Sequence, residues 1–143
     1  MENFDKLPVM LDPEAIMPTR AHESDAGLDL YTPFFIMVPP RGRSVIDTGV
    51  HVRIPDGYVG KLESKSGLMR KAGLTCRGTI DAGYTGTIQV VIFNHSDKVY
   101  TFEKGDKITQ LVIYPIATPS PIQVNGMELT DRGADGFGST GRQ

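Results

Sequence analysis

The stretch GTIDAGYTG, residues 78–86, places a carboxylate and an aromatic ring three residues apart, at a turn between two runs of β-forming residues. Asp81 ends the first run and Tyr84 opens the second. An ionised carboxylate in such a place can act as a general base, and the ring can form a flat wall for a sugar or a base. On these residues alone a plainer interpretation stays open, in which Asp81 caps the turn and Tyr84 is an ordinary hairpin aromatic.

Two further polar residues lie among apolar neighbours. Asp29 stands between Leu28 and Leu30, so a strand here would place the acid on the face opposite two apolar side chains. It is then either a solvent-facing residue or a carboxylate close to the water shell of a metal ion. Gln110, in the run ITQLVIY, either faces solvent or uses its amide to hold a phosphate oxygen or a water molecule.

The stretch SKSGLMRKAG, residues 64–73, predicts one or two helical turns. Ser66 is expected as the N-cap and Gly73 as the stop. The first amides would point outward around Ser66 and Gly67, and free amides at a helix N-terminus suit an anion. Most capped short helices bind nothing, so the helix alone does not predict a phosphate site.

The end of the chain, RGADGFGSTGRQ, is rich in glycine and carries one arginine and one phenylalanine. Glycine loses much backbone freedom on ordering, so residues 132–143 are expected to be mobile unless something holds them. The segment is therefore either a frayed tail or a lid that orders around a ligand.

The elements that position these residues are predicted to be strands. Sixteen glycines and ten prolines interrupt any helical pattern before it reaches several turns. Between them lie short runs of β-type residues, and such spacing is typical of an antiparallel sandwich, barrel or jelly roll. The predicted strands cover residues 45–54, 58–62, 88–93, 98–102 and 108–114.

Composition narrows the function classes. The chain has 143 residues, enough for one domain, and a formal charge of −2 with both signs interspersed, which predicts no nucleic-acid partner. No apolar run is long enough to cross a bilayer, so no membrane association is expected. The start lacks a signal-peptide pattern and Cys76 has no cysteine to pair with, which predicts a cytoplasmic protein. The three histidines have no zinc-ligand spacing.

Five stretches, taken in order, resemble the trimeric deoxyuridine triphosphate nucleotidohydrolases, the dUTPases. They are AGLDLY, SKSGL, GTIDAGYTG, GDKITQL and RGADGFGSTG. The resemblance implies an all-β subunit, a jelly roll or distorted β-barrel with one short helix, over residues 1–131, and a flexible lid over residues 132–143. It also implies a homotrimer with shared active sites, a Mg²⁺ cofactor, and hydrolysis of dUTP to dUMP and pyrophosphate. That reaction limits uracil incorporation into DNA and supplies dUMP for thymidylate synthesis.

The resemblance also implies a role for each matching residue. Asp81 would accept a proton from the water that attacks the α-phosphorus, Tyr84 would lie against the deoxyribose, and Asp29 would support the metal through water. The family's Mg²⁺ is held mainly by phosphate oxygens and water, as suits a cation that dehydrates reluctantly. Uracil would be read by the hairpin around Gly78, Thr79, Ile80 and Gln89. Phosphates would be held by Lys65, Ser66, Gly67, Gln110, Arg132, Gly138, Ser139 and Thr140, with Phe137 stacked on the uracil.

The sequence departs from the family pattern at two places. Lys65 stands where arginine is usual. Lysine lacks the bidentate fork of arginine, so we expect a weaker or rearranged contact with phosphate or supporting interaction with Asp106. Ala134 and Asp135 interrupt the glycine-rich end, and Asp135 adds a negative charge near a triphosphate.

Two other functions fit the sequence less well. A dCTP deaminase of the same fold would need a glutamate at Val91 and an arginine at Thr79, and both are missing. An inert jelly-roll module, such as a capsid-like or protein-binding domain, would leave five residues without a reason to occur together: Asp81, Tyr84, Gln110, Arg132 and Phe137. A regulatory role through another protein, in addition to catalysis, stays open.

Overall fold

The computed structural model describes residues 4–136 of the chain. It contains nine strands and, between the fifth and sixth of them, one helix, α1 (Ser66–Ala72). The strands within the described residues are β1 (Val9–Leu11), β2 (Gly27–Tyr31), β3 (Ile36–Val38), β4 (Arg43–Val52), β5 (Tyr58–Glu63), β6 (Leu74–Ile80), β7 (Thr87–Asn94), β8 (Tyr100–Phe102) and β9 (Lys107–Pro115).

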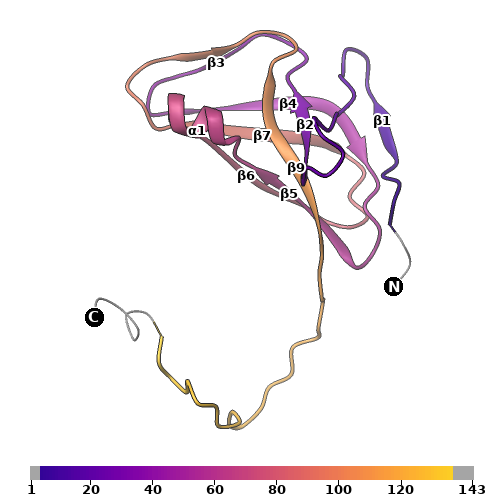
Figure 1. The fold of residues 1–143 in the computed structure, drawn as a ribbon, viewed down its shortest axis with the longest axis vertical. Helices are drawn as coiled ribbons and strands as arrows, with labels where there is room; N and C mark the ends of the chain where they lie inside the picture. The colour runs from indigo at the N-terminus through magenta and orange to yellow at the C-terminus, as the bar shows by residue number, and fades with distance from the viewer. Residues whose placement is uncertain (1–3, 137–143) are drawn as a thin grey trace.

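Seven of these strands form one curled antiparallel sheet in the order β1-β4-β7-β6-β5-β9-β2, and β3 pairs with β8 in a small second sheet. The curled sheet forms a half-barrel around the core, and α1 lies at the end of the inner strands β5 and β6, which it connects (Figure 1). This confirms the predicted all-β, jelly-roll class with one short helix. The described helix is too short to cross a membrane.

The five predicted strands correspond to β4, β5, β7, β8 and β9, with ends shifted by up to two residues. The three-residue strands β1 and β3 were not predicted, because each is too short to show an alternating pattern. They form through pairing with β4 and β8, which lie far along the chain.

The core lies on one face of the curled sheet. On β7 the buried residues alternate with half-buried or exposed ones, as a half-buried strand requires. The fully buried side chains include Leu30, Ile46, Ile54, Leu74, Ile88, Val90, Ile92, Phe102, Ile108 and Leu111.

Strand β4 carries an irregularity where it pairs with β7. Asp47 lies opposite Gln89 and His51 lies opposite Thr87, so β4 has two more residues than β7 between these pairs. Gly49 takes up the distortion with a φ of 68°, a left-handed conformation that favours glycine. The buried Thr48 hydroxyl donates to the Ile88 carbonyl at 2.7 Å and accepts from the Val50 amide at 3.2 Å. It thereby satisfies backbone groups that the irregular ladder leaves unpaired.

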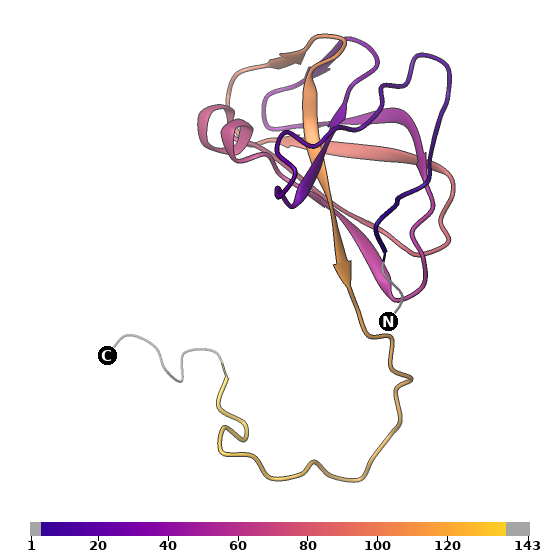
Figure 2. The ribbon, with the colours of Figure 1, turned by 45° about the vertical axis from the view of Figure 1, so that its right-hand side comes forward.

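The chain leaves the body after β9. The Ile116 amide still donates to the Gly57 carbonyl, but residues 117–136 contain no helix or strand (Figures 1 and 2). We call residues 117–136 the C-terminal segment. Its apolar side chains Ile122, Met127 and Leu129 are 81%, 87% and 101% exposed.

The two hydrogen bonds of the Thr48 hydroxyl lead to a prediction about the free energy of unfolding. Thr48→Val keeps the shape of the side chain but leaves the Ile88 carbonyl and the Val50 amide without that partner, so unfolding free energy should fall by about 1–3 kcal/mol. Urea denaturation measures it, with Thr101→Val on the exposed side of β8 as the matched control. Equal denaturation midpoints for the two variants would contradict this role of Thr48.

Candidate functional site

Strands β6 and β7 form a hairpin, but they are not paired with each other near the turn that connects them. The two strands pair from Leu74–Asn94 to Cys76–Ile92 and then separate, although β6 runs on to Ile80 and β7 starts at Thr87. Beyond Cys76, β6 pairs with β5 and β7 pairs with β4. The facing edges of the two strands therefore present backbone N–H and C=O groups that no strand pairs.

A cavity of about 410 Å³ lies at this opening. It is lined by Thr79, Ile80, Asp81, Tyr84, Thr87 and Gln89, which we call the hairpin pocket. Five of these six residues were predicted from the sequence. Thr87 was missed, and its place directly after the glycine that ends the turn is the signal that could have found it.

The turn that carries Asp81 and Tyr84 closes through a backbone hydrogen bond, in which the Tyr84 amide donates to the Asp81 carbonyl at 3.1 Å. Gly83 has a φ of 83°, so the predicted tight turn around Ala82 and Gly83 is confirmed. The Asp81 carboxylate is exposed and has no hydrogen-bond partner among the described residues. Its oxygens are therefore free to accept a hydrogen bond from water or ligand.

The Tyr84 ring lies close to the backbone at the end of the turn. Its hydroxyl donates to the Thr87 carbonyl at 2.9 Å, and the residue is 45% exposed. A Cβ atom on Gly86 would lie 2.6 Å from the hydroxyl oxygen and 2.8 Å from Cζ. Only glycine at position 86 lets the ring take this place.

A second pocket, of about 370 Å³, lies between β2, β9 and the start of α1. Its lining shares no residue with the hairpin pocket. It is lined by Ala21, Asp25, Ala26, Gly27, Asp29, Lys65, Lys107 and Gln110, which we call the lysine pocket.

Asp29 is buried and holds two lysines in the lysine pocket. Its Oδ1 accepts from Lys65 Nζ at 2.5 Å and its Oδ2 lies 3.4 Å from Lys107 Nζ. The Asp29 residue is 6% exposed, which rules out the solvent-facing residue, one of the two alternatives that the sequence left open. The two lysine side chains cover it, and sequence alternation alone could not show this.

The contacts of Lys65 agree with a rearranged interaction at this departure from the family pattern, because Lys65 pairs with Asp29 and not with Asp106. The Asp106 carboxylate instead accepts from the Glu103 amide at 2.8 Å, which closes a turn before β9. The Ser64 hydroxyl donates to the Cys76 carbonyl and accepts from the Cys76 amide, which fixes the chain between β5 and α1. Ser64 thus places Lys65 beside Asp29.

Gln110 lies opposite Asp29 in the β2–β9 ladder. Its Nε2 donates to the Ser64 carbonyl at 3.4 Å, and a Cβ on Gly27 would lie 2.3 Å from its Oε1. Gly27 therefore leaves the room in which the Gln110 amide lies. Lys107, on the same strand as Gln110, was missed, although its place in GDKITQL beside a predicted site residue was a usable signal.

Helix α1 begins at Ser66 with Lys65 as its N-cap, and no side chain caps it. The predicted N-cap role of Ser66 is therefore wrong, because Ser66 is already helical. Gly73 ends the helix with a φ of 68°, as predicted. Ser66 and Gly67 are exposed at the helix start and line neither pocket.

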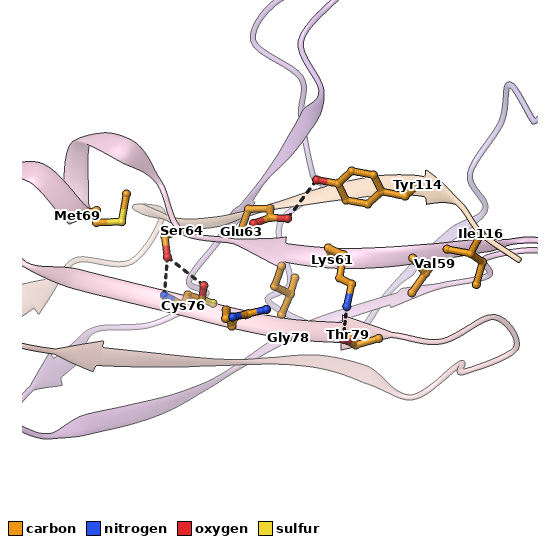
Figure 3. A pocket seen from close by; sticks show the side chains of 12 residues that line it. Val59, Lys61, Glu63, Ser64, Met69, Cys76, Gly78, Thr79, Tyr114 and Ile116 are labelled. Carbon is orange, nitrogen blue, oxygen red and sulfur yellow. Dashed lines mark hydrogen bonds between the residues drawn. The ribbon is translucent and has the colours of Figure 1, made fainter. Parts of the chain in front are cut away.

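A larger hollow, of about 730 Å³, lies on the face made by β5, β6 and β9, with Met69 of α1 at its end (Figure 3). Two of its charged side chains already have partners. Lys61 donates to the Thr79 hydroxyl at 2.8 Å, and the Glu63 carboxylate accepts from Tyr114, which raises the pKa of that tyrosine. Burial raises the pKa of the Cys76 thiol, so this hollow offers no ready nucleophile.

The remaining predicted residues are not brought to either pocket. Arg132 lies in the C-terminal segment, where its Nε donates to the Asp135 carbonyl. Gly78 lines the larger hollow and packs on Leu62. The predicted residues Phe137, Gly138, Ser139 and Thr140 lie outside the described residues. Among the described residues, no three acidic, histidine or cysteine side chains converge on a metal site.

Comparison with known proteins places the chain in a family. A family model described as dUTPase matches residues 13–141. The chain is 40% identical over 141 residues to a mitochondrial deoxyuridine 5'-triphosphate nucleotidohydrolase of Dictyostelium discoideum, covering 97% of this chain and 79% of that protein. A probable deoxyuridine 5'-triphosphate nucleotidohydrolase of Schizosaccharomyces pombe is 41% identical over 132 residues, covering 92% and 94%. The chain belongs to the dUTPase family.

Solved structures of dUTPases have the same fold as this chain. The dUTPase of Staphylococcus bacteriophage 80alpha with dUPNHPP superposes with a TM-score of 0.91 at 37% identity, covering 97% of this chain and all of that one. A mutant dUTPase from phage phi11 of S. aureus, described with a structural Mg(II) ion, has a TM-score of 0.81 at 35% identity, covering 87% and 100%.

The close contact between Tyr84 and Gly86 leads to a prediction about the position of the Tyr84 ring. Gly86→Ala places a methyl group inside contact distance of the ring, so Tyr84 should swing out and lose its bond to the Thr87 carbonyl while the fold persists. NMR shifts of the Tyr84 ring report this, with Gly126→Ala, where a Cβ meets open space, as control. Unchanged ring shifts in Gly86→Ala would contradict the contact.

Proposed function

We propose that this member of the dUTPase family hydrolyses dUTP to dUMP and pyrophosphate, with Asp81 accepting the proton of the water that attacks the α-phosphorus. One observation carries the proposal. The unpaired edges of β6 and β7 open onto a pocket that also holds Asp81, Tyr84 and Gln89. A pyrimidine inserted between these edges would meet backbone donors and acceptors in a fixed pattern, and a mismatched base would leave polar groups unpaired.

The free carboxylate of Asp81 supports its role as base. It is exposed at the turn and engaged by no described residue. A carboxylate is ionised at neutral pH and can orient water by a short hydrogen bond. Tyr84, at the other end of the turn, would lie against the deoxyribose and exclude a 2′-hydroxyl by collision.

The lysine pocket supports binding of the phosphates. Lys65 and Lys107 bring two ammonium groups, of which Lys107 is the more exposed, and these can pair with phosphate oxygens, although the lining also contains the carboxylates of Asp25 and Asp29. Gln110 adds an amide to the same pocket. We propose that this pocket, with the amides around Ser66 and Gly67, receives the triphosphate.

We propose that Mg²⁺ is bound through phosphate oxygens and water. The exposed carboxylate of Asp81 supports this arrangement, because its free oxygens can accept hydrogen bonds from the water shell of the ion. Bound there, the ion would neutralise charge on the triphosphate as pyrophosphate leaves. The outer-shell role of Asp29 stays a prediction, and the contacts present support a different task, holding Lys65 and Lys107 in place.

We propose that the site is completed by other copies in a homotrimer. The hairpin and lysine pockets share no residue, and Arg132 belongs to a segment outside the body. The exposed apolar side chains of that segment need a covering surface, which a second copy would supply. The 132–143 lid with Phe137 would then close over a neighbour's hairpin.

The cytoplasmic location stays a prediction, since one similar enzyme is named mitochondrial. The proposed reaction would limit uracil in DNA and supply dUMP.

A substrate panel tests the reaction. Purified protein with Mg²⁺ and dUTP, dCTP, dTTP or UTP should release pyrophosphate from dUTP alone. Asp81→Asn should lower turnover by about 10²-fold or more while dUTP binding, measured by calorimetry, stays within a few fold. Ammonia from dCTP, or no turnover of dUTP, would overturn the proposed function. Loss of binding together with turnover would assign Asp81 a structural role.

Removal of residues 132–143 tests the lid. The shortened chain should form the same oligomer by light scattering, because the described body is built before that point, and should lose most of its dUTP turnover. Full activity of the truncated protein would show that the lid assignment is wrong.

A further inference from the structure

The hairpin that carries Asp81 and Tyr84 is held from outside by His51. This residue lies on β4 opposite Thr87 of β7 and Met10 of β1. Its Nδ1 lies 2.7 Å from the Thr85 carbonyl oxygen, and its Nε2 lies 2.8 Å from Oδ1 of Asp12. The His51 side chain is 17% exposed, so both contacts are partly shielded from water.

The two contacts define the protonation state of the ring. A carbonyl oxygen and a carboxylate oxygen are both acceptors, so both ring nitrogens of His51 must donate. Only the imidazolium has two N–H groups. In agreement, the hydrogen bond to the Thr85 carbonyl, the hydrogen bond to Asp12 and the negative charges of Asp12 and Asp47 raise the pKa of His51 above its usual 6.5, against a smaller opposing effect of burial.

The irregular part of β4 places His51 between the Thr85 carbonyl and the Asp12 carboxylate. The Asp47 carboxylate accepts from the Gly49 amide at 3.0 Å, and the Gly49 carbonyl accepts from the Asp12 amide at 2.9 Å. The same distortion therefore aligns His51 with the hairpin and brings Asp12 to its far side.

The contact reaches the nucleotide-binding residues through the turn. Thr85 directly follows Tyr84, whose hydroxyl is held by the Thr87 carbonyl. On the other side of Tyr84, the Gly83 amide donates to the Ile54 carbonyl at 3.2 Å. The turn is thus fixed to β4 and the residues after it on both sides of Tyr84.

We infer that His51, as an imidazolium held by Asp12, is a positioning residue that keeps the 81–87 turn and Tyr84 in the geometry that receives the nucleotide. The substrate named here rests on the proposed function, whereas the clamp itself does not. His51 touches neither pocket and takes no part in proton transfer to substrate.

The pH dependence follows from the sign of the shift. A raised pKa means that the clamp is fully formed below pH 6.5 and is lost as pH rises through the higher value of the folded protein. Neutral imidazole keeps one N–H and turns a lone pair toward an oxygen of Asp12 or Thr85. The charged groups acting on the ring are Asp12, from the segment after β1, and Asp47, from β4, while the hairpin contributes the Thr85 carbonyl.

Kinetics of three variants test the positioning role at pH 7. His51→Ala should raise KM for dUTP roughly 3- to 10-fold and leave kcat within about twofold. His95→Ala, at a turn after β7, is the matched control and should leave both unchanged. Asp12→Asn should keep KM near the wild-type value, because its amide can donate to neutral His51, and should flatten the rise of KM with pH. An unchanged KM in His51→Ala, or an unaltered pH profile in Asp12→Asn, would overturn the inference.

Nitrogen-15 NMR gives a readout independent of activity. In the intact protein both ring nitrogens of His51 should be protonated at pH 6.5, with a pKa above 6.5, and amide exchange at residues 83–87 should be faster in His51→Ala than in His95→Ala. A His51 pKa below 6.5, or equal exchange in the two variants, would overturn the clamp. If the wild-type protein fails to hydrolyse dUTP, the proposed function fails, and these NMR measurements still decide the clamp.

Discussion

Strands β6 and β7 leave each other after the Cys76–Ile92 pair, and the candidate site depends on that separation. Beyond it, β6 follows β5 and β7 follows β4, so each strand keeps one partner and leaves one edge bare. Bare N–H and C=O groups are costly when buried and are satisfied here only by solvent or a ligand. The hairpin pocket, its free Asp81 carboxylate and the flat Tyr84 ring all lie at this opening.

The net charge of the chain does not describe the charged groups that meet in the lysine pocket. The chain as a whole is slightly acidic, yet the lysine pocket sets two ammonium groups around one buried carboxylate. Removing Asp29 from water is tolerable because both of its oxygens are paired. The arrangement orders two flexible lysine side chains and gathers their ammonium groups in one pocket, where they can meet an anion, although the net charge of the whole chain would disfavour one.

Local signals predicted much of the site. The turn around Gly83, the helix stop at Gly73 and the joint position of Asp81 and Tyr84 follow from turn chemistry within a few residues. What the sequence left open concerns contacts between distant segments. The environment of Asp29 and the partner of Lys65 are decided only when the ladder of β2 and β9 brings Asp29 beneath the chain that leads into α1. Thr87 and Lys107 were missed because a lining residue carries no signal of its own.

The sequence by itself determined the class of fold, the short helix and the family, since alternation, turn residues and short motifs are read within a few positions of the chain. The tertiary structure decided which of those stretches face one another. Lys65 meets Asp29 across 36 positions, His51 meets Thr85 across 34 and Asp12 meets His51 across 39. Such contacts depend on strand order and on the irregularity in β4, which arise from packing and pairing of the whole sheet and not from any local pattern.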